Sequence, residues 1–250
     1  MQDQKEGRPI LGQIDRDPGY LRVAKAIEAE IVAGRLKVGE LLPTEADLSA
    51  LLGVNRSTVR EGIRALENAA LVRRGVGKRL VISAPEPEVI TQVNTRAMRM
   101  MRVSFLDLWE VQMKLEPYAA RLAAEHRTPE QADALLANVA GLKANLDDDD
   151  FIIRCDVDFH RLIAEAAGNP VLSLATAPVG QLLYSATVDL YERIPQARHR
   201  LAAAHEAIAR AIAAGDAIES ERWAARHIRN FKRGYEVGGF DMTAPLPMRG

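Results

Sequence analysis

The sequence predicts a mainly α-helical protein, with an N-terminal winged helix-turn-helix followed by an all-α antiparallel helical bundle. Residues 43–66 have the pattern of two short helices around a glycine turn. A connector with two prolines in three residues follows at 85–87. Behind it, the apolar residues repeat with the period of helices and no strand pattern appears. These observations divide the chain into a small mixed unit and a larger helical one.

The first helix of the pair begins with a capping signal. Thr44 followed by Asp47 matches the capping box, in which each side chain bonds the backbone N–H of the other residue. Pro43, just before it, stops a helix from continuing upstream. We expect the buried side of this helix to come from Leu48, Leu51 and Leu52.

The second helix has one apolar and one basic side. Asn55 is a good N-cap, because its side-chain oxygen accepts an unpaired backbone N–H. The inward stripe, spaced i, i+4 and i+7, consists of Val59, Ile63 and Leu66. The residues that point away from it are Arg56, Ser57 and Arg60, with Arg64 further along. Such a helix can enter the major groove of DNA.

The flanking segments complete a winged helix-turn-helix. Apolar residues recur every four positions in 19–33, which predicts a third helix ending near Gly34. Residues 71–74 and 80–82 are expected as short strands around a turn at 75–78. The alternative is an ordinary helical domain with solvated arginines.

Residues 19–83 resemble the DNA-binding domain of GntR-type bacterial transcription regulators. The resemblance rests on the stretches GRLKVGELLPTEADL and LGVNRSTVREGIRALE and on the glycine-containing wing. It implies DNA contacts by Arg56, Ser57, Thr58 and Arg60, and by Lys78 and Arg79 on the wing. Two positions depart from the family pattern. Many members have Arg where this chain has Ala46, and Val76 replaces a polar wing residue found in some relatives.

The charge distribution fits DNA binding at one end of the chain. Residues 20–80 hold 11 Lys and Arg against 7 Asp and Glu, whereas the whole 250-residue chain has a net charge of −1. No run of 18 apolar residues exists, and the N-terminus lacks the features of a signal peptide, so we expect no membrane partner. A single cysteine, Cys155, fits the reducing cytoplasm.

We expect five parts along the chain. They are a mobile polar arm (1–18), the DNA-binding domain (19–83), a linker with the start of a connecting helix (84–94), an effector domain (95–237) and a loose tail (238–250). Pro117 and Pro178 should kink or break two helices of the effector domain. The helices expected behind the linker are 88–100, 104–126, 129–146, 149–167, 171–193, 197–214 and 216–235.

The helical domain contains a candidate metal site. Asp156 and His160 are four residues apart on one helix and therefore share a face. His205 and His227 lie on the apolar stripes of two later helices, so all three imidazoles point inward. An inward histidine is more often an ordinary core residue, but three of them with a carboxylate suit Zn²⁺, Ni²⁺ or Mn²⁺.

Residues 95–235 resemble the FCD ligand-binding domain of FadR-type GntR regulators. The matching stretches are KLEPYAARLAA, DVDFHRLIAEAAGNPVL and AHEAIARAIAAGDAIESERWAARHI. In metal-binding members, the Asp and three His of these segments hold a metal that helps to bind a small carboxylate. The resemblance carries this role over to Asp156, His160, His205 and His227. An Arg that is common just before the KLEP stretch, and often grips an acidic effector, is Gln112 here.

Several further residues are candidates for the effector pocket. We name Gln112, the turn residue Asn169 and Tyr184 as possible effector contacts, and add Tyr191 and Arg154 without a decisive signal.

The sequence thus predicts a metabolite-responsive regulator, more in keeping with a repressor than with an activator. Two chains would pair on a near-palindromic operator, and a small organic acid would be sensed at the divalent metal. One alternative is the same regulator with a metal-free pocket for an acyl or other ligand. A second alternative is a metal-dependent enzyme, although no general base is evident. A third alternative is an architectural DNA-binding protein without an effector.

Overall fold

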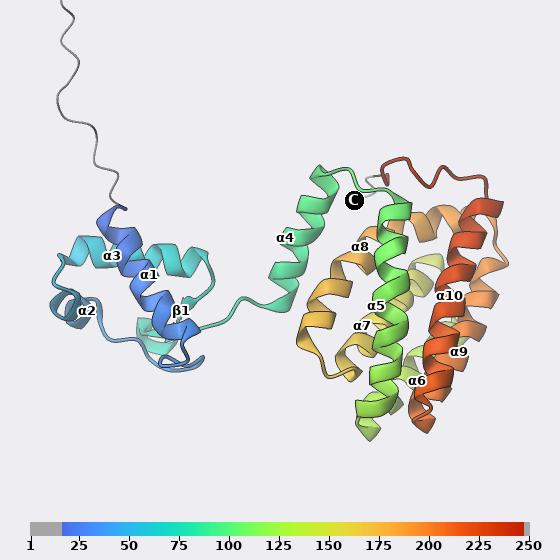
Figure 1. Ribbon diagram of the computed structural model, residues 1–250, viewed down its shortest axis with the longest axis horizontal. Coiled ribbons are helices and arrows are strands. Elements are labelled where there is room, and N and C mark those ends of the chain that lie inside the picture. The colour runs from blue at the N-terminus through green and yellow to red at the C-terminus, as the bar shows by residue number, and fades with distance from the viewer. Residues whose placement is uncertain (1–16, 248–250) are drawn as a thin grey trace, which may run out of the picture. The chain divides into compact units, whose positions relative to one another are not determined.

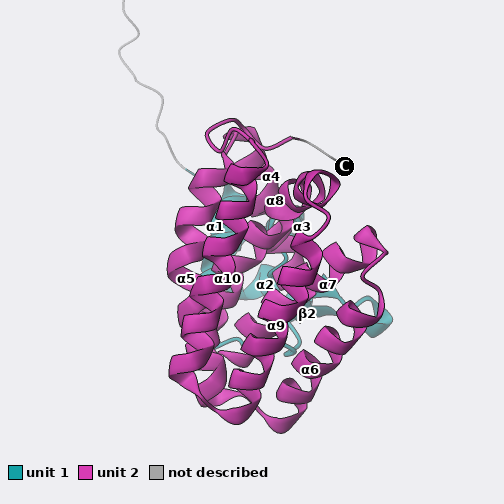
Figure 2. Ribbon diagram, turned by 90° about the vertical axis from the view of Figure 1, so that its right-hand side faces the viewer, with its two compact units in different colours: residues 1–86 teal, residues 87–250 magenta. Residues whose placement is uncertain are grey.

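The computed structural model describes residues 17–247, which form two compact units. One ends at Glu86 and the other begins at Pro87 (Figure 2). The arm expected at residues 1–18 lies outside the described residues except for Asp17 and Pro18. The mainly helical fold class expected from the sequence is confirmed.

Among the described residues of the first unit, 17–86, there are three α-helices and a two-stranded sheet (Figure 1). Its elements are α1 (Gly19–Val32), α2 (Glu45–Leu52), α3 (Arg56–Asn68), β1 (Val72–Arg74), the 3-10 turn η1 (Val76–Lys78) and β2 (Leu80–Ile82). The strands pair antiparallel, with Val72 opposite Ile82 and Arg74 opposite Leu80. The wing is therefore a short hairpin that follows α3 directly.

Local signals account for the turn between α2 and α3. The capping box of Thr44 and Asp47 is present, and Asn55 caps α3 through the N–H of Thr58. Gly53 ends α2 with φ 63°, a left-handed conformation that side chains disfavour. The predicted helix-turn-helix is confirmed in these details.

The core of this unit forms where α1, α3 and the hairpin meet. It contains Val59, Ile63 and Leu66, the inward stripe of α3, together with residues of the other elements. The expectation for α2 is only partly right, because Leu48 is buried whereas Leu51 is 73% exposed and Leu52 38% exposed. Since α2 is only eight residues long, it buries one turn of side chains and leaves the last turn in solvent.

Gly62 allows α3 to approach α1 closely. A Cβ atom at this position would lie 2.7 Å from Cγ1 of Val23 and 3.0 Å from the carbonyl oxygen of Tyr20. We expect Gly62→Ala to destabilise the first unit by about 1–2 kcal/mol, because the steric cost exceeds the gain in helix propensity. Differential scanning calorimetry of the whole chain measures this change.

Gly141 provides the matched control, because it also lies inside a helix. A Cβ atom there would meet Phe151 at 3.7 Å, an ordinary contact. Gly141→Ala should therefore stabilise the second unit by up to about 1 kcal/mol. Equal effects of the two substitutions would contradict the close-approach argument.

In its described part, residues 87–247, the second unit has seven helices joined by short connections (Figure 1). They are α4 (Pro87–Met100), α5 (Phe105–His126), α6 (Pro129–Ala144), α7 (Asp149–Ala166), α8 (Pro170–Arg193), α9 (Ala197–Ala214) and α10 (Ala217–Val237). Capping boxes begin α5 at Ser104 and α6 at Thr128. Four aspartates stand at residues 147–150, and one of them, Asp148, caps α7, because its side chain accepts from the N–H of Phe151.

Both prolines that were expected to kink or break helices lie within continuous ones. Pro117 is buried in α5 and Pro178 is buried in α8, and neither helix is interrupted. The expectation of a break is therefore wrong. A proline removes one backbone hydrogen bond, whereas packing along the remaining length of each helix stabilises the continuous form.

Among the described residues, α8 has a length and composition that would suit a membrane span, with a mean hydropathy of 1.3. Half of that stretch is buried inside the structure. The helix packs against α4, α5 and α7. Its apolar composition thus belongs to the core of the helical unit.

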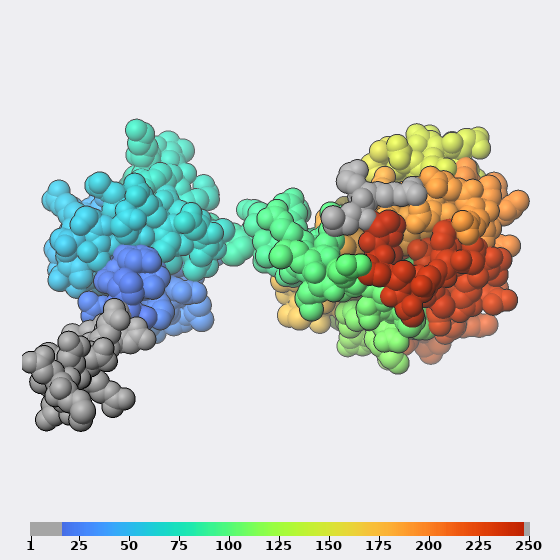
Figure 3. Space-filling view, turned by 90° about the horizontal axis from the view of Figure 1, so that it is seen from above, coloured from blue at the N-terminus to red at the C-terminus, as the bar shows by residue number. Residues whose placement is uncertain are grey.

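The C-terminal segment, residues 238–247, packs against the helical unit. The expectation of a loose tail is therefore wrong for these residues. Phe240 stacks on Tyr235, with ring centroids 4.5 Å apart, and Met242 accepts a hydrogen bond from the N–H of Leu106 at 3.0 Å. Leu246 donates to the carbonyl oxygen of Val103 at 3.2 Å. Figure 3 shows this red segment against the green surface around the start of α5. Apolar side chains bind it to the bundle, which a reading of local composition missed.

Candidate functional site

The first candidate site is the exposed side of α3. Val59 and Ile63 have no exposed surface and Leu66 is 2% exposed, so the opposite side of the helix faces solvent. Arg56, Ser57 and Arg60 are exposed there, as the helical periodicity predicted, and Thr58 is half-buried. Guanidinium groups at the start of such a helix can reach base edges or phosphates.

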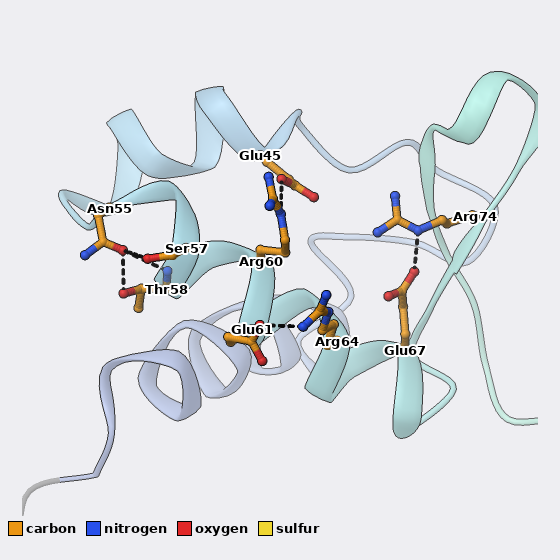
Figure 4. Close-up of polar contacts among 9 residues, drawn as sticks. All are labelled: Glu45, Asn55, Ser57, Thr58, Arg60, Glu61, Arg64, Glu67 and Arg74. Atoms are coloured by element: carbon orange, nitrogen blue, oxygen red, sulfur yellow. Dashed lines mark hydrogen bonds and ion pairs between the residues drawn. The ribbon is translucent and has the colours of Figure 1, made fainter.

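The hydroxyl groups at the start of α3 are tied to its cap (Figure 4). Oδ1 of Asn55 accepts hydrogen bonds from the Ser57 and Thr58 hydroxyls, both at 2.7 Å, and from the Thr58 N–H at 2.8 Å. Each hydroxyl oxygen keeps free lone pairs, so it can accept a hydrogen bond from a base amino group. The cap thus orients both side chains.

Arg60 is held by a carboxylate from α2 (Figure 4). Its Nε donates to Oε2 of Glu45 at 3.1 Å, while the arginine side chain remains 54% exposed. The terminal nitrogens are therefore available to a partner, because the contact uses only the Nε proton. Arg64, one turn further, instead pairs with Glu61 at 2.7 Å.

A basic hollow of about 430 Å³ lies between α3, the start of α2 and the wing. Its lining includes the predicted Arg56, Arg60, Lys78 and Arg79, as well as Ala46, which leaves space where family members have Arg. It also includes Arg74, which the sequence analysis did not name. Arg74 follows the buried Val72 by two residues on β1 and is bound to Glu67 at 3.0 Å. The sequence did offer a signal for Arg74, because two adjacent arginines, Arg73 and Arg74, stand at the end of the strand.

The wing presents its basic residues next to a tight turn. Gly77 and Lys78 both have positive φ, 68° and 60°. Val76 is 99% exposed at the tip, and Lys78 and Arg79 are exposed behind it. A cationic tip of this kind suits contact with the phosphate backbone.

The second candidate site lies inside the helical unit. Asp156 and His160 come from α7, His205 from α9 and His227 from α10, and one potential ligand atom of each lies within 4.8 Å of the others. His205 is fully buried and His227 is 9% exposed. The structure therefore brings together all four residues that the sequence analysis selected.

The distances within this four-residue cluster suit a shared cation. Oδ1 of Asp156 lies 3.2 Å from Nε2 of His205 and 3.5 Å from Nε2 of His160. Nε2 of His160 and Nε2 of His227 are 3.4 Å apart. Two ligands that each lie about 2.1 Å from one ion are separated by roughly 3.0–3.4 Å. The ring of His205 is kept in place by Phe159, which stacks on it at 3.9 Å.

Three side-chain atoms of the cluster residues are buried and lack a hydrogen-bond partner. They are Oδ1 of Asp156 and both ring nitrogens of His205. Leaving such groups unpaired is costly in a protein interior, and a bound cation would satisfy the aspartate oxygen and Nε2 of His205. A carboxylate and three imidazoles are also a suitable ligand set for Zn²⁺, Ni²⁺ or Mn²⁺. The residues fit a divalent metal.

The protonation states also suit ligation. Burial opposes ionisation of Asp156, but the adjacent rings of His160 and His205 outweigh it and hold its pKa well below the usual range. Burial lowers the pKa of His205 and the pKa of His227, which leaves both rings neutral. Burial also opposes a charge on His160, but the nearby Glu116 and Asp156 raise the pKa of this ring well above its usual value. An ionised carboxylate beside the neutral rings of His205 and His227 is the form that binds metals, and His160 joins them as a ligand when a cation displaces its Nε2 proton.

Glu116 is a site residue that the sequence analysis missed. Its Oε2 lies 2.6 Å from Nδ1 of His160, and its Oε1 accepts from Nε2 of Gln112 at 3.0 Å. A proton on Nδ1 leaves the lone pair of the neutral ring on Nε2, which faces the cluster. Glu116 could have been found from the sequence, because it is a carboxylate on the inward side of α5, four residues after Gln112 and next to Pro117.

A small cavity of about 30 Å³ adjoins the cluster. Its lining includes Asp156, His160 and His227, the predicted Gln112, and Tyr191. The other candidates lie elsewhere. Asn169 is the N-cap of α8 and Tyr184 packs in an apolar cluster, so neither lines this cavity, and Arg154 is exposed. For Asn169, backbone capping fully explains the residue.

Family comparisons agree with both units. The model for bacterial regulatory proteins of the gntR family matches residues 19–82, and the model for the FCD domain matches residues 107–230. These two domains indicate a transcription regulator and not an enzyme.

Individual relatives share this organisation. The HTH-type transcriptional repressor NanR of Escherichia coli O7:K1 is 31% identical over 176 residues, which cover 67% of each chain. NanR of Escherichia coli K12 is 28% identical over 221 residues, covering 87% of this chain and 84% of the relative. The solved structure of Streptococcus agalactiae GntR has the same fold, with a TM-score of 0.63 and 24% identity, over 86% of this chain and 99% of that one. The chain belongs to the GntR family of bacterial transcription regulators, with an FCD domain behind its DNA-binding domain.

Proposed function

We propose that this regulator is a repressor that binds a near-palindromic operator as a dimer in the cytoplasm, and that a small organic acid bound at a divalent metal controls it. The observation that carries the proposal is the buried cluster of one aspartate and three histidines. The repressor role is supported by the names of the relatives. Two-fold pairing follows from the way winged and other helix-turn-helix proteins read paired half-sites.

The DNA-binding part of the proposal assigns different tasks to the exposed residues. Arg56 and Arg60 reach base edges from α3, with Ser57 and Thr58 beside them. Lys78 and Arg79 on the wing contact the backbone, together with Arg74 in the same hollow. Phosphate contacts supply affinity that falls as salt increases, whereas base contacts supply specificity.

The metal part assigns ligation to Asp156, His160, His205 and His227. A bound divalent ion supplies positive charge and open coordination positions that a carboxylate can occupy. Glu116 holds the His160 ring, and Phe159 packs against the His205 ring. The adjoining cavity receives the rest of the effector.

Contacts across α8 offer a physical connection between the effector cavity and the helix that follows the linker. Gly180, Leu183 and Thr187 of α8 line the cavity. On the same helix, Gln181 accepts a hydrogen bond from the Thr95 hydroxyl of α4 at 3.1 Å. The cavity is too small for an organic acid, so binding requires its walls to move, and movement of α8 would reach α4. The effector acts through its difference in affinity between the two arrangements.

The test combines metal analysis with DNA binding. The operator is first selected from a random DNA library with the purified full chain. Elemental analysis should find about one divalent ion per chain, and sedimentation should find two chains per operator. Chelation should remove the response to organic acids measured by fluorescence anisotropy. A response that survives chelation would instead support the metal-free pocket, and absence of operator binding would contradict the proposal altogether.

Glu116→Gln should weaken metal binding roughly 10–100-fold. The carboxylate faces Nδ1 of His160 with one oxygen and accepts from Gln112 with the other, whereas an amide must turn its NH₂ group toward one of them. Isothermal titration calorimetry with Zn²⁺ or Ni²⁺ measures the change. Glu125→Gln, on the exposed end of the same helix, is the control and should bind the metal like the wild type. Equal metal affinity of both variants would remove Glu116 from the site.

A further inference from the structure

Gln112 is buried beside the metal cluster without being one of its ligands. Its side chain comes from the middle of α5 and is only 5% exposed. It lines the same cavity as Asp156, His160 and His227. A polar amide at such a position requires hydrogen-bond partners, because burial removes it from water.

The orientation of this amide is set by Glu116. The carboxylate of Glu116 can only accept hydrogen bonds when it is ionised. Its two oxygens face Nδ1 of His160 at 2.6 Å and the Gln112 side chain at 3.0 Å. Gln112 must therefore direct its NH₂ group toward Glu116. The other terminal atom of the amide, which does not face Glu116, is then the oxygen.

That oxygen is left without a partner. Oε1 of Gln112 is buried and has no hydrogen bond among the described residues. Gln112 cannot exchange its two amide atoms without facing an oxygen toward the carboxylate. A residue that lines the cavity therefore holds an unpaired acceptor of fixed orientation, next to a cluster that suits a carboxylate-binding metal.

We propose that Gln112 accepts a hydrogen bond from a hydroxyl or N–H group of the effector, so that the site selects a substituted acid, a hydroxy acid above all. The inference rests on the proposed metal site and specifies the ligand class that this site takes. The remaining walls suit a compact molecule with an apolar side, since Leu183, Ile228 and Phe231 line the same cavity. An acid that lacks the donor leaves the Gln112 oxygen unpaired and binds more weakly.

The experiment compares matched acids that differ only in a hydroxyl group. Lactate is compared with propionate, and malate with succinate, by calorimetry on the metal-loaded full chain. We expect the hydroxylated member of a pair to bind about 10-fold or more tightly, as loss of a hydrogen bond to a buried group implies. In Gln112→Leu, the preference should fall to near unity while the affinity for the plain acid changes little.

Controls separate this inference from the function on which it rests. Gln92→Leu, at an exposed position of α4, should retain the preference. If Gln112→Leu does not fold, Gln112→Asn takes its place. Its side chain is shorter by one methylene group, so the amide oxygen lies further from the effector. Metal affinity and operator affinity are measured in each protein. If metal and operator bind normally but the members of each pair bind equally or not at all, a buried water is the partner of Gln112 and only this inference is overturned. Loss of metal binding by the wild type would overturn the proposed function as well.

Discussion

His205→Ala is expected to bind Zn²⁺ or Ni²⁺ on the order of 100-fold more weakly than the wild type, or not detectably. Replacing a residue that only orients a metal ligand already lowers the metal affinity about 10–100-fold. His205 is placed to be a ligand itself. It is fully buried, and its Nε2 faces Asp156 at 3.2 Å without a hydrogen-bond partner. Removing the ring takes away one of three imidazoles and leaves the Asp156 carboxylate less well neutralised. Calorimetric titration of metal into chelator-treated protein measures the loss.

Two further variants control this result. His205→Asn keeps a polar side chain in the cavity that the alanine would leave, and it should also lose metal binding. His199→Ala changes an exposed histidine near the start of the same helix and should bind metal normally. Circular dichroism verifies that each protein is folded. A folded His205→Ala or His205→Asn protein with wild-type metal affinity would exclude the four-residue site.

Arg60→Ala is expected to weaken operator binding by about 1–3 kcal/mol, and Arg56→Ala by a similar amount, if each reads a base. Both side chains are exposed on α3 and line the basic hollow. For Arg60 the contact with Glu45 adds a geometric constraint, because it holds Nε and points the other nitrogens outward. Arg60→Lys should not restore affinity, since an ammonium lacks the planar donor pattern. Fluorescence anisotropy on the selected operator measures the changes.

Arg64→Ala provides the matched control on the same helix. Arg64 is exposed and paired with Glu61, but it does not line the hollow. Its replacement should change operator affinity much less than replacement of Arg60. If all three variants bound the operator like the wild type, α3 would not be the reading helix.

The first unit could be predicted closely because its signals are local. The capping residues Thr44 and Asn55, the glycine turn and the i, i+4, i+7 stripe each depend on a few neighbouring residues. The prediction was wrong for Leu51 and Leu52, which are exposed although they are apolar and well spaced. Burial depends on what lies opposite a helix, and periodicity contains no information about that.

The cluster of one aspartate and three histidines could be predicted in part for the same reason. Asp156 and His160 share a face because the helix repeat places residues four apart together. His205 and His227 could be assigned to inward stripes of their own helices. That three inward faces meet within 4.8 Å at one point depends on how α7, α9 and α10 pack, which is a property of the whole bundle.

The sequence by itself determined the two units, the helices and their caps, the basic face of α3 and the four inward residues of the cluster. Each follows from helix periodicity, side-chain hydrogen bonding or charge over short spans of chain. Only the tertiary structure decided that Glu116 contacts His160, that Gln112 lines the cavity with its oxygen unpaired, and that Arg74 joins the basic hollow. It also decided that the segment up to Pro247 packs on the bundle. These contacts join residues from different elements, so they depend on the angle and register at which those elements pack.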